Sequence, residues 1–87
     1  MTSVEYRIQI TRRAEKDIAK LTPKERVKLY DILTEVIAKN PFQGKKLIGD
    51  LVGSYSYRLS YKDRIVYSID SKGKVIYIER AATHYGE

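Results

Sequence analysis

Residues 55–78, YSYRLSYKDRIVYSIDSKGKVIYI, form three runs of aromatic and β-branched residues that short polar turns separate. Apolar and polar residues alternate over 55–61, which is the period of a strand with one buried face. The second run, 64–69, follows a Lys-Asp turn, and the third run, 75–78, follows a turn that contains glycine. The third run is apolar almost throughout, as is typical of a central strand. The sequence therefore predicts a meander of three consecutive strands.

The residues before this meander predict a further strand and a short helix. Residues 4–10 alternate between apolar and polar side chains, the pattern of a half-buried strand. Thr11 can cap the N-terminus of a following helix. In that helix, Ala14, Ile18 and Leu21 recur at i, i+4 and i+7 and form one apolar face. We expect the strand to join the same sheet as the meander.

A capping-box signature marks the start of a second helix. Thr22 is a good N-cap residue, a proline follows at the first helical position, and Glu25 stands where it can bond back to the N-cap backbone. An apolar stripe then continues until Asn40, whose backbone avoids the helical region because Pro41 follows it. The sequence predicts a helix over 23–39.

Residues 42–53 contain three glycines, two adjacent lysines and scattered apolar residues, and we interpret them as an ordered loop. The predicted order of elements is strand, helix, helix, strand, strand, strand. This order indicates a single α+β domain over 1–87, in which two N-terminal helices pack on one face of a mainly antiparallel, four-stranded twisted sheet. The other face of the sheet is left for function.

The composition bounds the class of protein. A chain of 87 residues forms one small core with no room for a large enclosed pocket, so no cofactor is expected. Zero cysteines exclude a disulfide framework and favour a cytoplasmic protein. No apolar run reaches the roughly 20 residues that span a bilayer, so no membrane association is expected. The net charge of +6 favours a polyanionic partner such as RNA, DNA or an acidic protein.

Four polar residues of the C-terminal half could carry out phosphodiester chemistry. His84 is the single histidine of the chain and can take up or release a proton near neutral pH. Arg58 and Arg64 can bind phosphate through the planar guanidinium group, and a hairpin between their strands would bring them close. Tyr85 can stack on a base or donate a proton. Together these side chains are chemically sufficient to cleave RNA without a metal.

Each of these residues also has a structural interpretation. A histidine near a chain end is more often solvated than catalytic. The two arginines could be solvated, or paired with Asp63 or Asp70, instead of binding phosphate. Most of the eight tyrosines could simply pack the sheet. Spacing alone therefore leaves both a nucleic-acid site and a purely structural set of residues open.

Further basic and aromatic residues are candidates for binding the substrate, because cations and tyrosines together suit unstacked bases on a phosphate chain. These candidates are Lys45, Lys46, Tyr57, Lys62 and Arg80. The two adjacent lysines could equally be a solvated part of a loop. One histidine, no cysteine and acidic residues at scattered positions do not match the spacing of a metal site, so none is expected.

Several segments of the chain are similar to those of a known family. They are Tyr6-Arg7-Ile8-Gln9-Ile10-Thr11, Ala14 and Asp17, Asn40-Pro41, Leu47…Leu51-Val52-Gly53, Tyr57-Arg58-Leu59, Arg64-Ile65-Val66-Tyr67 and Arg80-Ala81-Ala82-Thr83-His84-Tyr85. Over essentially the whole chain they resemble the RelE/ParE superfamily of type II toxin–antitoxin toxins, and the terminal His-Tyr is most similar to the YoeB branch. The resemblance implies the microbial RNase-like RelE fold. It also implies an mRNA interferase, a metal-independent endoribonuclease that cleaves mRNA in the ribosomal A site and leaves a 2′,3′-cyclic phosphate, so that translation is inhibited.

The same resemblance implies the partners. The substrate would be mRNA on the ribosome, and a cognate acidic antitoxin would wrap around the toxin. Operator DNA would be bound only by the complex of toxin and antitoxin, which represses its own operon.

The resemblance also implies roles for individual residues. Arg64 is similar to the family's phosphate-stabilising arginine, His84 and Tyr85 to its terminal catalytic pair, and Arg58 to a second basic residue of the preceding strand. One departure concerns the general base, because residues 43–46 read Gln-Gly-Lys-Lys where YoeB-like proteins place a catalytic glutamate. Either one of these two lysines takes over, as in RelE, or His84 is the base.

Two other functions remain open at this point. A ParE-like toxin would share the fold but would poison DNA gyrase by binding it, without hydrolysis and without a need for the terminal His-Tyr. A non-toxic nucleic-acid-binding module is the third interpretation. The joint presence of Arg64, His84 and Tyr85 favours the endoribonuclease.

Overall fold

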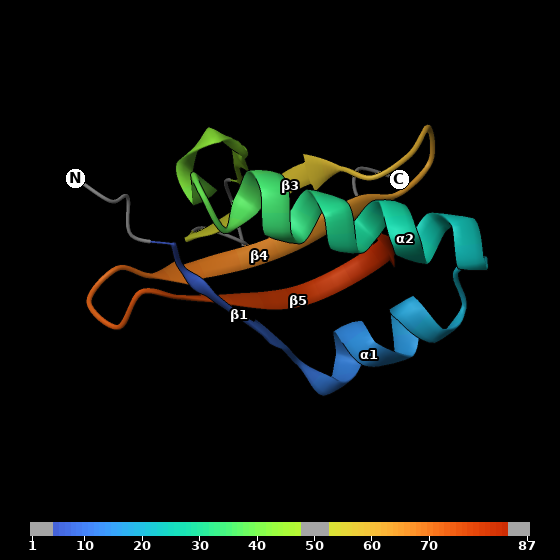
Figure 1. The fold of residues 1–87 in the computed structure, drawn as a ribbon, viewed down its shortest axis with the longest axis horizontal. Coiled ribbons are helices and arrows are strands. Elements are labelled where there is room, and N and C mark those ends of the chain that lie inside the picture. The colour runs from blue at the N-terminus through green and yellow to red at the C-terminus, as the bar shows by residue number, and fades with distance from the viewer. Residues whose placement is uncertain (1–4, 48–52, 84–87) are drawn as a thin grey trace.

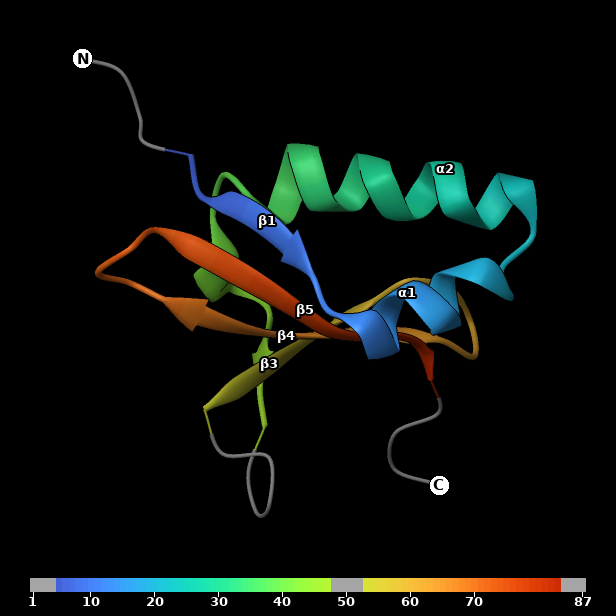
Figure 2. The same ribbon diagram turned by 90° about the horizontal axis from the view of Figure 1, so that it is seen from below.

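The computed structural model describes residues 5–47 and 53–83. A twisted sheet forms one layer, and both helices lie on the same side of it, as Figure 1 and Figure 2 show. The sheet has five strands in the spatial order β1-β5-β4-β3-β2. The strands are β1 (Arg7–Ile10), β2 (Lys45–Lys46), β3 (Ser54–Arg58), β4 (Arg64–Asp70) and β5 (Val75–Thr83). The α+β class expected from the order of elements is confirmed.

The predicted meander is present at the centre of the sheet. β3 pairs antiparallel with β4, and β4 pairs antiparallel with β5. β1 lies beside β5 and runs parallel to it, so β5 has a neighbour on each side, as the apolar run 75–78 predicted. The β1–β5 pair is the one parallel pair among the described strands, which confirms a mainly antiparallel sheet.

The prediction of four strands is wrong by one, because part of the predicted loop pairs with the sheet. Lys45 and Lys46 form β2, opposite Ser56 and Tyr55 of β3. A 3₁₀ turn over Pro41–Gln43 leads into this strand. Two exposed lysines carry no apolar alternation, so the sequence pattern gave no sign of β2. A short, lysine-rich strand is suited to an edge because it does not invite pairing with other chains.

The two helices begin at the caps that the sequence predicts, and they are α1 (Arg12–Ala19) and α2 (Pro23–Ile32). The hydroxyl oxygen of Thr11 accepts a hydrogen bond of 3.3 Å from the first turn of α1. The backbone N–H of Glu25 donates to the hydroxyl oxygen of Thr22 at 3.2 Å, and the Thr22 N–H donates to the Glu25 carboxylate at 3.0 Å. The capping box is therefore complete.

The helix predicted over 23–39 changes character before its end. The α-helix stops at Ile32, and Leu33–Ile37 continues as a π-helix, in which the Ala38 N–H donates to the Leu33 carbonyl oxygen at 2.8 Å. Leu33 and Ile37 both stay buried through this wider turn. Apolar spacings of three and four residues fit either type of turn, so the sequence does not distinguish them.

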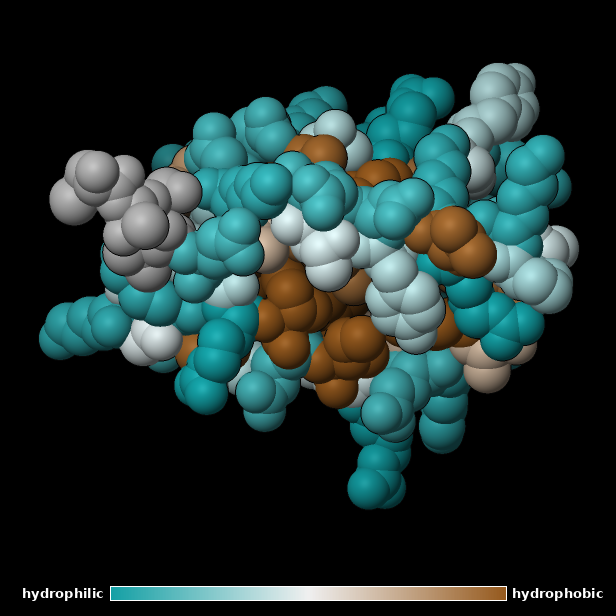
Figure 3. All heavy atoms as spheres, in the orientation of Figure 1, coloured by the Kyte–Doolittle hydropathy of each residue, from teal (hydrophilic) through white to brown (hydrophobic). Residues whose placement is uncertain are grey.

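One continuous apolar core lies between the helices and the sheet. Its buried members are Ala14, Ile18, Leu21, Leu29, Leu33, Ile37, Leu59, Ile65, Tyr67, Ile76, Ile78 and Ala81. Figure 3 shows the helix-bearing face as mainly hydrophilic, with apolar atoms gathered between α2 and β1. Because side chains alternate along a strand, Tyr57 and Ile65 face this core while Arg58 and Arg64 project from the other side of the sheet.

Candidate nucleic-acid interface

The two arginines predicted to bind phosphate are direct neighbours across a hairpin. Arg58 is the last residue of β3, Arg64 is the first residue of β4, and the two are paired in register. Directly opposite residues of an antiparallel pair have Cβ atoms about 5 Å apart. The hairpin therefore brings the two arginines next to each other, as the sequence predicts.

The carboxylates that could have neutralised these arginines are engaged elsewhere. Asp63 accepts a hydrogen bond of 3.3 Å from the hydroxyl of Ser60, and Asp70 accepts one of 3.2 Å from the Gly73 N–H. Within 5–47 and 53–83, neither arginine forms an ion pair. Pairing of these arginines with Asp63 or Asp70 is therefore absent among the described residues, which leaves solvation and anion binding as their two interpretations.

The arginine pair opens onto a cavity of about 550 Å³ at the end of the sheet, which we call the basic cavity. Its lining comes from α2, from β2 and the turn before it, and from both sides of the β3–β4 hairpin at the edge of β3 that β2 does not cover. The lining residues are Lys28, Ile32, Gln43, Gly44, Lys45, Ser56, Tyr57, Arg58, Leu59 and Arg64. Four of the predicted site residues, Lys45, Tyr57 and the two arginines, thus come together from two separate segments of sequence.

Lys28 is a part of this cavity that the sequence did not indicate. It is exposed on α2, one turn before Ile32, and both side chains line the cavity opposite the hairpin. In the sequence Lys28 is one of several charged residues on the polar side of an amphipathic helix. Only the packing of α2 over β3 brings it near the arginine pair.

A buried tyrosine fixes the turn that carries Gln43 and Lys45. The Tyr67 hydroxyl donates to the backbone carbonyl oxygen of Pro41 at 2.7 Å. Burial raises the pKa of Tyr67 to about 12. A side chain at Gly44 would collide with the Tyr67 hydroxyl, so glycine is required where this turn crosses the ring. Tyr67 is thus a structural tyrosine that positions one wall of the basic cavity.

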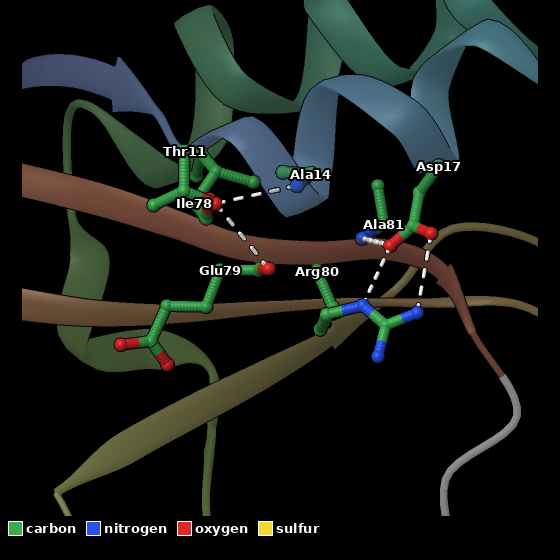
Figure 4. A network of polar contacts seen from close by, with 7 residues as sticks. All are labelled: Thr11, Ala14, Asp17, Ile78, Glu79, Arg80 and Ala81. Carbon is green, nitrogen blue, oxygen red and sulfur yellow. Dashed lines mark hydrogen bonds and ion pairs between the residues drawn. The ribbon is translucent and has the colours of Figure 1, made fainter.

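Three predicted substrate-binding residues lie away from the basic cavity. Lys46 lines a second cavity of about 470 Å³ near Phe42 and Tyr55. Lys62 is exposed in the turn between β3 and β4. Arg80 lies on β5 and reaches Asp17 of α1, as Figure 4 shows.

The Arg80–Asp17 contact joins α1 to the sheet. Arg80 Nε donates to Asp17 Oδ2 at 2.8 Å and Arg80 Nη2 donates to Oδ1 at 3.2 Å. The Ala81 N–H donates to Oδ2 at 3.0 Å. Burial alone would raise the pKa of Asp17, but the hydrogen bonds from Arg80 and Ala81 outweigh it and lower the pKa. An ionised carboxylate with three donors is a stable anchor for α1.

His84 and Tyr85 lie outside the described residues. Their chain neighbour Thr83, at the end of β5, is paired in register with Arg64 of β4. The covalent chain therefore continues into His84 from the position directly beside the arginine pair.

In the described parts of the chain, no three side chains of the metal-ligating types gather into one group. The helices found there are too short and too polar to cross a bilayer.

Comparison with known proteins matches this chain to toxins of bacterial toxin–antitoxin systems. A family model described as the ParE-like toxin of type II bacterial toxin–antitoxin systems matches residues 8–86. The solved RelBE2 toxin–antitoxin complex of Mycobacterium tuberculosis contains a similar chain, with 27% identity, a TM-score of 0.85, and coverage of 93% of this chain and 100% of that one. No curated protein matches by sequence.

Two further solved complexes contain similar chains. The YoeB–YefM complex of Staphylococcus aureus matches at 25% identity and a TM-score of 0.74, covering 92% of this chain and 98% of that one. The intact RelBE complex of Escherichia coli matches at 25% identity and a TM-score of 0.73, covering 90% and 95%. The chain therefore belongs to the ParE-like toxin family of type II bacterial toxin–antitoxin systems.

Proposed function

We propose that this toxin is an mRNA interferase, an endoribonuclease that cleaves mRNA in the ribosomal A site without a metal ion. The observation that carries the proposal is the Arg58–Arg64 pair, which opens onto the basic cavity and has no ion-pair partner among the described residues. Two like charges set opposite each other destabilise a hairpin unless an anion lies between them. A phosphodiester is the anion that fits two guanidinium groups.

The reaction is a transfer of the phosphoryl group within the RNA. The 2′-oxygen attacks the neighbouring phosphorus, a P–O2′ bond forms, and the P–O5′ bond breaks. The 2′-hydroxyl loses its proton to a base, and the leaving 5′-oxygen gains a proton from an acid. The products are a 2′,3′-cyclic phosphate and a 5′-hydroxyl, and neither water nor an oxidant is consumed.

The arginine pair stabilises the charge that builds up on the phosphoryl oxygens as the phosphorane forms. Such stabilisation is the largest single contribution in many enzymes because it is stronger in the transition state than in the bound substrate. Lys28 and Lys45, on the other walls of the basic cavity, add positive charge for the phosphates on either side. Tyr57 offers an aromatic wall on which a base can stack.

Proton transfer is assigned to the chain end and to the lysine wall. His84 follows Thr83, the residue paired with Arg64, and Tyr85 comes next. Of the two lysines that stand in place of the YoeB-like glutamate, Lys45 lines the basic cavity and Lys46 does not. The pH–rate profiles of Lys45→Met and His84→Ala distinguish the two proton-transfer roles, because removal of the base eliminates the acidic limb and removal of the acid eliminates the basic limb.

A cognate antitoxin is the second part of the proposal. The similar chains from M. tuberculosis, S. aureus and E. coli were all solved in toxin–antitoxin complexes. A net charge of +6 favours an acidic partner, and the complex of the two would bind operator DNA. The substrate itself would be mRNA on the ribosome, in the cytoplasm.

The description of the matching family keeps one alternative in view. ParE-like toxins give the family its name, and a gyrase-poisoning toxin would act by binding alone. Such a toxin would need neither the unpaired arginines nor His84.

Induction in growing cells distinguishes the two functions. Expression of the wild-type chain is expected to arrest growth and to produce new 5′ ends within the codons of ribosome-bound mRNA, and His84→Ala is expected to abolish both effects. Lys72→Ala, in the exposed turn between β4 and β5, serves as the control and is expected to behave as wild type. Arrest with DNA damage and without mRNA cleavage would favour the gyrase alternative.

A further inference from the structure

A bulge in β5 turns the carboxylate of Glu79 onto the side of the sheet that carries Arg58 and Arg64. Val66 of β4 is paired with Arg80, whereas the next residue, Tyr67, is paired with Ile78, so Glu79 is an extra residue in the strand. Bulges re-aim side chains and are frequent beside active sites. Figure 4 shows the Glu79 and Arg80 side chains on the same side of β5, with the Glu79 carboxylate turned away from the guanidinium group, which reaches Asp17 of α1.

The Glu79 side chain is held across the neighbouring strand. Its Oε1 accepts a hydrogen bond of 3.0 Å from the hydroxyl of Ser54, on β3, so the carboxylate extends over β4. Ser54 itself is only 8% exposed, whereas Glu79 is half-buried. Oε2 has no partner within the described residues. The carboxylate is thus fixed in direction and still has an oxygen to offer.

An exposed aromatic ring lies in the same row of the sheet as this carboxylate. Ser54 is paired with Ser68 and Ser68 is paired with Tyr77, so the three residues cross β3, β4 and β5 in one line. Tyr77 lies between two core residues of β5, and its side chain is 37% exposed on the opposite side. A ring and a carboxylate two strands apart, about 10 Å, are spaced to hold a base between them.

We infer that Glu79 and Tyr77 form a subsite for a guanine base of the RNA, next to the phosphate held by the arginine pair. Guanine alone presents two adjacent donors, N1–H and the N2 amino group, which match the two oxygens of a carboxylate. Tyr77 would stack on the face of the base. The inference rests on the proposed function, because it assigns the sequence preference of the same enzyme.

Distance and charge both support this assignment. Ser54 and Arg58 are four residues apart on one side of β3, which places the carboxylate about 13 Å from the arginine pair. A base one or two nucleotides from the scissile phosphate can reach that far. A carboxylate beside an RNA backbone weakens binding by repulsion from phosphate. A contact with the donors of a base edge offsets that repulsion and discriminates between bases.

Replacement of guanine by inosine tests the subsite, because inosine lacks only the N2 amino group. Cleavage rates are measured on ribosomes with mRNAs that carry guanosine or inosine at each position around the cleaved codon. At one position the wild-type enzyme is expected to prefer guanosine by about tenfold or more. Glu79→Gln keeps an oxygen for the Ser54 hydroxyl and removes the charge, and it is expected to reduce that preference to within twofold while cleavage continues. Glu15→Gln, on the exposed side of α1, makes the same charge change and is expected to keep the preference.

The possible outcomes distinguish failure of the guanine subsite from failure of the proposed endoribonuclease function. A Glu79→Gln enzyme that retains the guanosine preference overturns the subsite, as does a wild-type enzyme that cleaves guanosine and inosine equally at every position. If the wild-type protein cleaves no mRNA, the proposed function fails, and the subsite is then tested by fluorescence anisotropy with short single-stranded RNAs. In that assay Glu79→Gln must lose the preference for guanosine over inosine, and Tyr77→Ala must weaken binding where Tyr77→Phe does not.

Discussion

Arg58 and Arg64 are paired directly across the β3–β4 hairpin, and no carboxylate of the described residues forms an ion pair with either of them. Like charges in this position destabilise a hairpin. The pair therefore lowers stability in the free protein and becomes favourable when an anion binds. Removal of one arginine should therefore stabilise the free protein.

Arg58→Gln is expected to stabilise the free protein by about 0.5 kcal/mol, because it removes the repulsion within the pair. The free energy of unfolding is measured by urea denaturation at low salt. Arg13→Gln, on the exposed surface of α1, removes the same charge away from the hairpin and is expected to change stability less. A loss of stability greater than 1 kcal/mol on replacement of Arg58 would show that this arginine has a structural role.

Asp17→Asn is expected to destabilise the protein by about 2 kcal/mol, because the hydrogen bonds from Arg80 and the Ala81 N–H lose their charged acceptor. Glu15→Gln, which changes an exposed carboxylate on the same helix, is the matched control. Equal stability of the two variants in urea denaturation would contradict the role assigned to the Asp17–Arg80 contact.

The same carboxylate predicts a specific pH dependence. The pKa of Asp17 is lower in the folded protein than its ordinary value of 3.8, so folding favours the ionised form. The stability that this carboxylate contributes is present above the ordinary value and is lost as the pH falls through the lowered pKa. The difference in unfolding free energy between wild type and Asp17→Asn should therefore shrink below pH 3.8. A difference that stays constant down to the acid transition would contradict this linkage.

Tyr67→Phe is expected to cost about 1–2 kcal/mol, because the buried carbonyl of Pro41 loses its donor. In the wild type, the raised pKa of about 12 means that this contribution is present below pH 10 and is lost as the pH rises toward 12. Tyr61→Phe changes a side chain that is 92% exposed and should leave stability unchanged, both below pH 10 and as the pH rises toward 12. A Tyr67→Phe variant as stable as Tyr61→Phe would show that the hydroxyl does not hold the turn.

Local signals in the sequence were sufficient for most of the fold. The caps at Thr11 and Thr22 depend on residues three positions apart, and the Arg58–Arg64 pairing follows from a short turn between two alternating runs. Contacts between distant segments were not predictable in the same way. Asp17 meets Arg80 across 63 positions of sequence, and neither residue carries a pattern that indicates the other.

The residues of the candidate site that the sequence did not indicate also depend on contacts between distant segments. Lys28 is a solvated residue by helical periodicity, and it joins the basic cavity only because α2 packs over β3. Glu79 belongs to an apolar strand by pattern, and the bulge that re-aims it depends on the register between β4 and β5. Register is a property of the assembled sheet, and a single strand does not encode it.

The central claim is that the arginine pair stabilises the transition state of RNA cleavage. It is tested most directly by the single-turnover rate at which purified protein cleaves mRNA in the A site of programmed ribosomes. Arg64→Ala is expected to lower this rate by about 100-fold or more, while binding of the ribosome changes by only a few fold. Arg13→Ala, on α1, should match wild type, and the product should end in a 2′,3′-cyclic phosphate. An Arg64→Ala protein that cleaves at the wild-type rate, or that loses only its affinity, would contradict the account.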